Sequence, residues 1–200
     1  MQSGLGPQRE ENNDNIRIMK RKEVFSFKKN IFVLHCKSTM NLIRNLAEEE
    51  EGTTIISLRQ NAGRGRKGNE WVSKPGGLYF SFLLRPRFHP RWNEKLYLLT
   101  TKAVENVIQD YLPTKQVEFK VPNDVLVNRK KISGVLIDTK AEGNQTLFMI
   151  VGIGINISNE VPSIATSIVN EGAEGITPTD VLLKFQEIFT SSYNDWMANI

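Results

Sequence analysis

Hydrophobic positions along this chain follow two periods, and their succession predicts a sheet with helices packed on it. Short apolar or alternating segments predict strands. They lie at 31–34, 54–60, 78–84, 117–120, 124–127, 131–138 and 146–157. The first of them, 31–34, is continuously apolar and is expected to be a buried strand. The strands at 124–127 and 131–138 are joined by the polar turn Asn128-Arg129-Lys130.

Three other segments repeat apolar residues at helical spacing. Ser38 or Thr39 can cap the first helix, and its apolar face is Leu42, Ile43, Leu46 and Ala47. The second runs from about 93 to 111 and ends before Pro113; its stripe is Leu96, Leu99, Ala103, Val107 and Tyr111. The third starts with a cap at Thr177, a proline and a first-turn acid. Its stripe, expected in the core, is Leu182, Phe185, Phe189, Tyr193 and Trp196.

This order of elements predicts an α+β domain in which helices pack on a mixed β-sheet. A chain of 200 residues is most simply one domain, and it is long enough to bury a substantial core. Residues 1–27 are polar and contain Gly4, Gly6 and Pro7, so we expect a flexible N-terminal extension there. The folded domain is expected to span residues 28–200.

Composition narrows the possible functions. Apolar residues make up 40% of the chain and no run approaches the length of a membrane span, so we expect a cytoplasmic protein without membrane contact. Cys36 is the single cysteine, which excludes an internal disulfide and a cysteine metal cluster. The net charge of +4 reflects 26 basic and 22 acidic residues. Because aromatic residues are not interleaved with the basic clusters, small anionic ligands are favoured over nucleic acid.

Two basic segments have the residues of an anion site. Gly63-Arg64-Gly65-Arg66-Lys67-Gly68 combines cations with glycines whose amides can approach an oxyanion. It is bracketed by two predicted strands, so it is a loop held by a sheet at both ends. The second segment runs from 120 to 134 and contains Lys130 and Lys131. A glycine-arginine run is also typical of RNA-contacting segments, so a basic nucleic-acid-binding module stays an alternative.

Four motifs in these regions carry a family resemblance. QNAGRGRKGNEW at 60–71 is similar to the glycine-rich ligand loop of biotin protein ligases, and KVPNDVLVNRKKISGVLID at 120–138 resembles their KWPND segment. VGIGIN at 151–156 resembles their G-x-G-I-N strand, and HCKST at 35–39 resembles the Ser-Thr pair that opens their first helix. The resemblance covers roughly residues 31 to 157, and four motifs in the family's order make a specific signal.

The resemblance implies a fold of the class II aminoacyl-tRNA synthetase catalytic type, as in the biotin/lipoate ligases. It implies ATP-dependent attachment of biotin, through biotinyl-5′-AMP, to a lysine of the biotin-acceptor domain of a carboxylase, with Mg²⁺. A lipoate or octanoate ligase of the same superfamily is the nearest rival. The family's usual C-terminal SH3-like domain is expected to be absent. About thirty residues precede the first strand, too few for a DNA-binding domain, so we expect no DNA binding. The sequence leaves a homodimer open.

The resemblance also assigns roles to residues of this chain. The catalytic pair is Lys131 and Arg66. The expected biotin contacts are Ser38, Thr39, Gln60, Gly63, Arg64, Arg66, Trp71, Lys131, Gly134, Gly152 and Gly154. The expected ATP or adenylate contacts are Arg64, Arg66, Lys67, Gly68, Trp71, Asn123, Asp124, Lys131 and Asn156. Asn123 and Asn156 are the expected Mg²⁺ contacts.

Three features refine this assignment. Gly152 and Gly154 alternate along one strand, so both fall on one face and leave room for a flat ligand. Met40 stands where the family usually has asparagine, and Val121 replaces the tryptophan of KWPND. The glycine-rich segment 61–77 is expected to be mobile and to become ordered over the adenylate.

Overall fold

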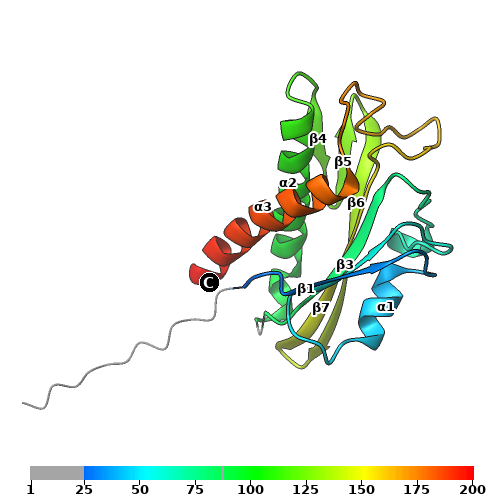
Figure 1. The fold of residues 1–200 in the computed structure, drawn as a ribbon. Coiled ribbons are helices and arrows are strands. Elements are labelled where there is room, and N and C mark those ends of the chain that lie inside the picture. The colour runs from blue at the N-terminus through cyan, green and yellow to red at the C-terminus, as the bar shows by residue number, and fades with distance from the viewer. Residues whose placement is uncertain (1–24, 87) are drawn as a thin grey trace, which may run out of the picture.

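The computed structural model describes residues 25–86 and 88–200, and its centre is one seven-stranded sheet. The strand order is β1-β2-β3-β7-β6-β5-β4 (Figure 1). The strands are β1 (Lys29–Val33), β2 (Thr53–Ser57), β3 (Leu78–Leu84), β4 (Val117–Lys120), β5 (Asp124–Val127), β6 (Lys130–Glu142) and β7 (Gln145–Ile155). The pair β1–β2 is parallel and the other neighbours are antiparallel, so the predicted mixed sheet is confirmed.

In the part of the chain that the structure describes, three α-helices cover the two faces of this sheet (Figure 1). The helix α1 (Thr39–Asn45) packs on one face against β2, β3 and β7. On the other face lie α2 (Asn93–Tyr111) and α3 (Pro178–Ala198), which cross each other. Short 3₁₀ turns occupy Arg66–Gly68 and Pro90–Trp92. Within the described ranges, no helix is both long and apolar enough to cross a membrane.

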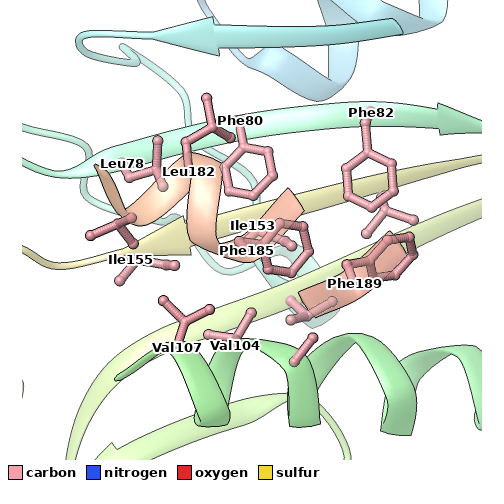
Figure 2. Close-up of a cluster of buried hydrophobic side chains, with 14 of the residues drawn as sticks. Leu78, Phe80, Phe82, Val104, Val107, Ile153, Ile155, Leu182, Phe185 and Phe189 are labelled. Carbon is pink, nitrogen blue, oxygen red and sulfur yellow. The ribbon is translucent and has the colours of Figure 1, made fainter. Parts of the chain in front are cut away.

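Side chains that alternate along the central strands pack into two hydrophobic cores, one on each face of the sheet. In β3, Leu78, Phe80 and Phe82 enter the larger core beneath α2 and α3, whereas Leu83 enters a smaller one beneath α1. Figure 2 shows the larger core, where rings from β3 meet Phe185 and Phe189 of α3. The rings of Phe80 and Phe185 meet edge to face, with centroids 5.2 Å apart. Such aromatic packing adds about 1 kcal/mol per pair beyond buried area and anchors the sheet that carries the site.

Local signals predicted the bounds of α2 and the start of α3, whereas α1 ends at Asn45, before the predicted face residues Leu46 and Ala47. The structure gives α2 the predicted bounds, with Leu96, Ala103 and Val107 fully buried. At the start of α3, the Thr177 hydroxyl accepts from the Asp180 amide and the Asp180 carboxylate accepts from the Thr177 amide. This reciprocal capping satisfies two amide donors that the first turn would otherwise leave free.

The beginning of the domain differs from the prediction in two respects. The strand at 31–34 is not buried: β1 is an edge strand, and Phe32 and Leu34 are 63% and 77% exposed. Phe25, assigned to the extension, is only 6% exposed and packs edge to face on Phe189 and Tyr193. The ordered domain therefore already includes Phe25. Phe27 packs against the same core, and residues 1–24 of the predicted extension lie outside the described residues.

Candidate active site

A cavity of about 230 Å³ opens on the α1 face of the sheet, between five segments. The start of α1, the loop between β2 and β3 and residues 123–124 at the start of β5 form its walls, while β6 and β7 form its floor. It is lined by Thr39, Met40, Gln60, Arg64, Gly65, Arg66, Lys67, Asn69, Glu70, Trp71, Asn123, Asp124, Lys131, Gly134, Val135, Leu136, Gly152, Ile153 and Gly154. Cationic, amide and apolar groups thus converge on one concave site, which is typical of small-molecule sites.

Glycines make the floor flat. Gly134 of β6 is the register partner of Gly154 of β7, and Gly152 lies two residues further along the same face. A β-carbon placed on Gly154 would lie 2.4 Å from the indole of Trp71, and one on Gly152 would lie 2.7 Å from Met40. The two glycines do share a face, as predicted. However, the room they leave is partly filled by Trp71 and Met40, which rest directly on the backbone.

Replacing Gly154 with alanine is expected to displace Trp71, because a rigid ring and a backbone leave the new methyl group no space. The free energy of unfolding should fall by about 1–3 kcal/mol, as overpacking usually costs. Denaturant unfolding measures this. Gly152→Ala is the matched control, since its neighbour is the flexible Met40, and it should cost clearly less. Equal costs at the two positions would contradict the packing described.

A chain of hydrogen bonds fixes the polar end of the cavity. The side-chain oxygen of Gln60 accepts from the backbone amide of Thr39 at 2.8 Å, and the side-chain nitrogen of Gln60 donates to the Ser73 hydroxyl at 2.9 Å. The hydroxyls of Thr39 and Ser81 share a hydrogen bond of 2.7 Å. Ser81 was not predicted, although a serine inside an otherwise apolar strand is a signal of such a partner.

Ser38 and Trp71 each retain one polar atom that the structure leaves unbonded. Ser38 occupies the cap position of α1, but its hydroxyl makes no capping bond and is buried without a partner. The indole nitrogen of Trp71 is buried without a partner as well. Leaving such a donor unbonded costs about 1–3 kcal/mol, so both are candidates for ligand contacts.

Lys131 faces the cavity because of a β-bulge. Val125 pairs with Ser133 but Leu126 pairs with Lys131, so Ile132 is an extra residue in β6. In a regular strand, Lys131 and Gly134 would lie on opposite faces of the sheet, because they are three residues apart. The bulge brings both side-chain positions to the same face, and redirecting a side chain is a common effect of bulges. The Lys131 ammonium lies 2.8 Å from the Asp124 carboxylate and 5.2 Å from the Trp71 ring centre. Lys131 and Asp124 therefore stand together at the edge of the glycine floor.

The glycine-rich loop folds back on itself above the floor. Gly65 donates to the Asn69 carbonyl at 2.7 Å and Trp71 donates to the Gly63 carbonyl at 2.9 Å. At the tip, Lys67 and Gly68 have φ of 57° and 78°, a conformation that favours glycine at the second position. Arg66, held in this hairpin, donates to the side-chain oxygen Oδ1 of Asn123 at 2.9 Å. The loop is thereby joined across the cavity to the turn that precedes β5. The mobility of the loop stays a prediction.

Arg64 forms an ion pair with a carboxylate of β6. It lies 2.7 Å from the carboxylate of Asp138, which also pairs with Arg44 of α1. One carboxylate thus links the loop, α1 and the sheet. Each member is partly exposed, so water screens the pairs and each contributes roughly 1 kcal/mol or less to stability.

A second cavity of about 190 Å³ adjoins the first and shares Glu70, Trp71 and Lys131 with it. Its far wall comes from the segment after β7, from Asn156 to Ala165. Asn156 lines this second cavity rather than the first. Its amide donates to the Thr166 carbonyl at 3.0 Å, and its oxygen accepts from Asn159 at 3.1 Å.

The structure brings most predicted site residues together. Those lining the first cavity are Thr39, Gln60, Arg64, Arg66, Lys67, Trp71, Asn123, Asp124, Lys131, Gly134, Gly152 and Gly154. Four predicted residues do not line this cavity: Ser38, Gly63, Gly68 and Asn156. Sequence reasoning missed Asn69 and Glu70, which follow directly on the glycine-rich motif, and the apolar Val135, Leu136 and Ile153. Burial raises the pKa of the Cys36 thiol, which agrees with its having no assigned role.

Comparison with known proteins identifies the family. A profile described as the Biotin/lipoate A/B protein ligase family matches residues 33–156, more than half of the chain. The chain belongs to this family. Among curated relatives, a bifunctional ligase/repressor BirA of Bacillus subtilis is 34% identical over 172 residues, covering 81% of this chain and 53% of that protein. A biotin–protein ligase of Arabidopsis thaliana is 33% identical, covering 77% and 47%. The chain thus spans about half the length of these relatives.

Solved structures of biotin protein ligases share the fold. That from Aquifex aeolicus, in complex with biotin and ATP, is 31% identical with a TM-score of 0.67, covering 84% of this chain and 73% of that one. That from Leishmania major, in complex with biotinyl-5-AMP, is 25% identical with a TM-score of 0.68, covering 81% and 73%. The predicted class, an α+β domain of the biotin/lipoate ligase type, is confirmed.

Proposed function

We propose that this chain activates biotin with ATP to biotinyl-5′-AMP and transfers the biotinyl group to a lysine of an acceptor protein. The observation that carries the proposal is the convergence of Lys131, Arg64 and Arg66 on a cavity with a glycine floor. Relatives with this fold are biotin protein ligases, and two of their structures contain biotin with ATP or the adenylate. Family and geometry support the same chemistry.

The reaction gathers negative charge, and the residues present suit that demand. In the first step the biotin carboxylate attacks the α-phosphorus of ATP, forming the mixed anhydride and releasing pyrophosphate. Two anions must therefore approach each other. Lys131, at the edge of the floor, is the proposed contact of carboxylate and α-phosphate, and Arg66 closes over the adenylate. Cations held in place by Asp124 and Asn123 need little rearrangement as charge develops.

In the second step the acceptor's lysine amine attacks the carbonyl of the anhydride, the amide bond forms and AMP leaves. No protein nucleophile is required for this sequence. Binding, orientation and exclusion of water are the tasks left to the chain. Gln60, Thr39 and Ser38 are the proposed contacts of the ureido ring, and Trp71 the cover of the apolar body.

We place the nucleotide across the boundary between the two cavities, because Lys131 and Trp71 line both. Lys67 and Gly68 at the loop tip then face the phosphates. Asn156 lines the second cavity, so it remains a proposed contact of the nucleotide. Its oxygen already accepts from Asn159, so that contact requires either a second lone pair or rearrangement.

The proposed Mg²⁺ fits better as part of the ATP substrate than as an ion held by the chain. Among residues 25–86 and 88–200, no group of three or more His, Cys, Asp or Glu side chains is placed to hold a metal. The oxygen of Asn123 accepts from Arg66, and that of Asn156 from Asn159. Mg²⁺ commonly binds substrate phosphates and few protein groups. Protein coordination by the two asparagines thus has little support here.

The acceptor is proposed to be the biotin-acceptor domain of a carboxylase. A cytoplasmic location, where ATP is abundant, and the absence of DNA binding stay predictions. Some relatives are named ligase/repressor, and this chain spans about half of their length. One observation favours the rival lipoyl or octanoyl substrate: Met40 adds an apolar side chain, 3% exposed, to the cavity wall.

Biotin-dependent release of pyrophosphate from ATP tests the first step. We expect biotin to stimulate release strongly and lipoate or octanoate to stimulate it little. Stimulation by lipoate and not by biotin would favour the rival function, a lipoate ligase. Binding of nucleic acid that weakens steeply with salt, with no pyrophosphate release, would favour the basic binding module instead.

Met40→Asn is expected to tighten biotin binding severalfold, because the amide can supply a missing contact to the ureido ring. One buried hydrogen bond is worth about 1 kcal/mol. The variant should also lose about 2 kcal/mol of stability, since Met40 packs in the smaller core with Ile43 and Ile150. Calorimetry measures the affinity, and Met40→Leu, which keeps the volume, is the control. Unchanged or weaker binding in the asparagine variant would mean that the ureido ring does not lie beside residue 40.

A further inference from the structure

The backbone of Lys131 is held by a segment far along the chain. Its carbonyl accepts from the amide of Thr166 at 2.9 Å, and Ala165 pairs with Lys131 in an isolated parallel bridge. The next carbonyl, that of Ile132, accepts from the amide of Asn156 at 2.9 Å. The segment after β7 therefore runs beside the first residues of β6 and fixes the point from which the Lys131 side chain projects.

A single carboxylate joins this segment to the turn that precedes Lys131. One oxygen of Glu171 accepts from the Thr166 hydroxyl at 2.6 Å, and the other accepts from the Asn128 amide at 2.8 Å. Asn128 and Arg129 form the β5–β6 turn with φ of 49° and 66°. Arginine is unfavourable in that region, so the turn benefits from an outside restraint. Glu171 thus links the turn before Lys131 to the segment that pairs with the Lys131 backbone.

We propose that Glu171 is a positioning residue for Lys131, acting through Asn128 and Thr166. It lines neither of the two cavities described above, so it does not itself reach a ligand there. A carboxylate suits the place because both partners donate and it can accept from both at once. The inference rests on the proposed role of Lys131 in adenylate formation. A displacement of about 1 Å at a catalytic group can cost up to about a hundredfold in rate.

Biotin-dependent pyrophosphate release by variants at position 171 gives the first test. Glu171→Ala should lower kcat about tenfold and leave the KM for biotin within about twofold, because the ureido contacts lie elsewhere. Glu171→Gln should retain most of the rate, since its oxygen can accept from Asn128 while its amide donates to the Thr166 hydroxyl. Glu174→Ala, an exposed carboxylate in the same loop, is the matched control and should match the original protein. An unchanged kcat in Glu171→Ala would overturn the proposal.

A double-mutant cycle separates positioning of Lys131 from a general structural role. In the Lys131→Ala background, Glu171→Ala should cost less than about twofold, because the group it positions is gone. The same tenfold loss in both backgrounds would overturn the proposal while leaving the proposed function intact. A normal rate in Lys131→Ala alone would instead overturn the role of Lys131, and this inference with it. Thr166→Val, which removes only the hydroxyl that reaches Glu171, is the second variant should Glu171→Ala fail to fold. It should lose about threefold and show the same coupling, and equal losses in both backgrounds would again overturn the proposal.

Discussion

Replacing Lys131 by alanine is expected to lower the rate of biotinyl-adenylate formation about a hundredfold. The change removes the charge placed where two anions meet, and losing one such preorganised contact typically costs about 3 kcal/mol. Single-turnover pyrophosphate release, with biotin and ATP saturating, measures the chemical step. Binding of biotin should change much less, because the groups at the polar end of the cavity are untouched.

Lys130 provides the matched control for this prediction. It is exposed, adjacent in sequence, and one residue before the bulged segment of β6. Lys130→Ala should retain nearly the full rate. Wild-type-like pyrophosphate release in Lys131→Ala, or an equal loss in both variants, would remove Lys131 from the chemical step.

Arg66→Gly is expected to form biotinyl-adenylate but to release it into solution. In the structure, Arg66 joins the loop to the turn before β5 through a hydrogen bond to Asn123, and that bond is lost in the variant. A lid that no longer closes lets water and amines reach the mixed anhydride. We therefore expect indiscriminate labelling of lysines on a bystander protein, at least tenfold above the original protein.

Asn61→Gly is the control for the loop's flexibility, because it adds a glycine to the same loop without removing a cation. Bystander labelling should stay low in this variant. The opposite outcome for Arg66→Gly is a variant that makes no diffusible adenylate because activation itself fails. Arg66 would then belong to the chemical step rather than to the lid.

Local sequence signals predicted most of the helices and strands, and motif resemblance named residues that the structure brings into one cavity. Helical spacing gave α2 its bounds, and the Thr177 cap with its proline gave the start of α3. These features depend on neighbours within one or two turns, so they can be read from the chain itself. Motif resemblance placed Gln60, Trp71 and Lys131 in one site, and all three line the cavity.

Long-range geometry accounts for what the sequence did not reveal. The bulge at Ile132 depends on how β5 and β6 pair, so the sequence alone does not show how Lys131 and Gly134 come to share one face. The hydrogen bond between Thr39 and Ser81 joins residues 42 positions apart. An apolar run such as 31–34 predicts a strand equally well at an edge or a centre, and only the strand order shows that β1 is an edge.

The most direct test of the proposed function is ATP-dependent transfer to an acceptor. The protein is incubated with ATP, Mg²⁺ and a biotin-acceptor domain, once with biotin and once with lipoate, and the mass of the acceptor is read. The account predicts that the acceptor gains one biotinyl group, only when ATP is present, and gains no lipoyl group. An acceptor unchanged by biotin, or modified by lipoate instead, would contradict it.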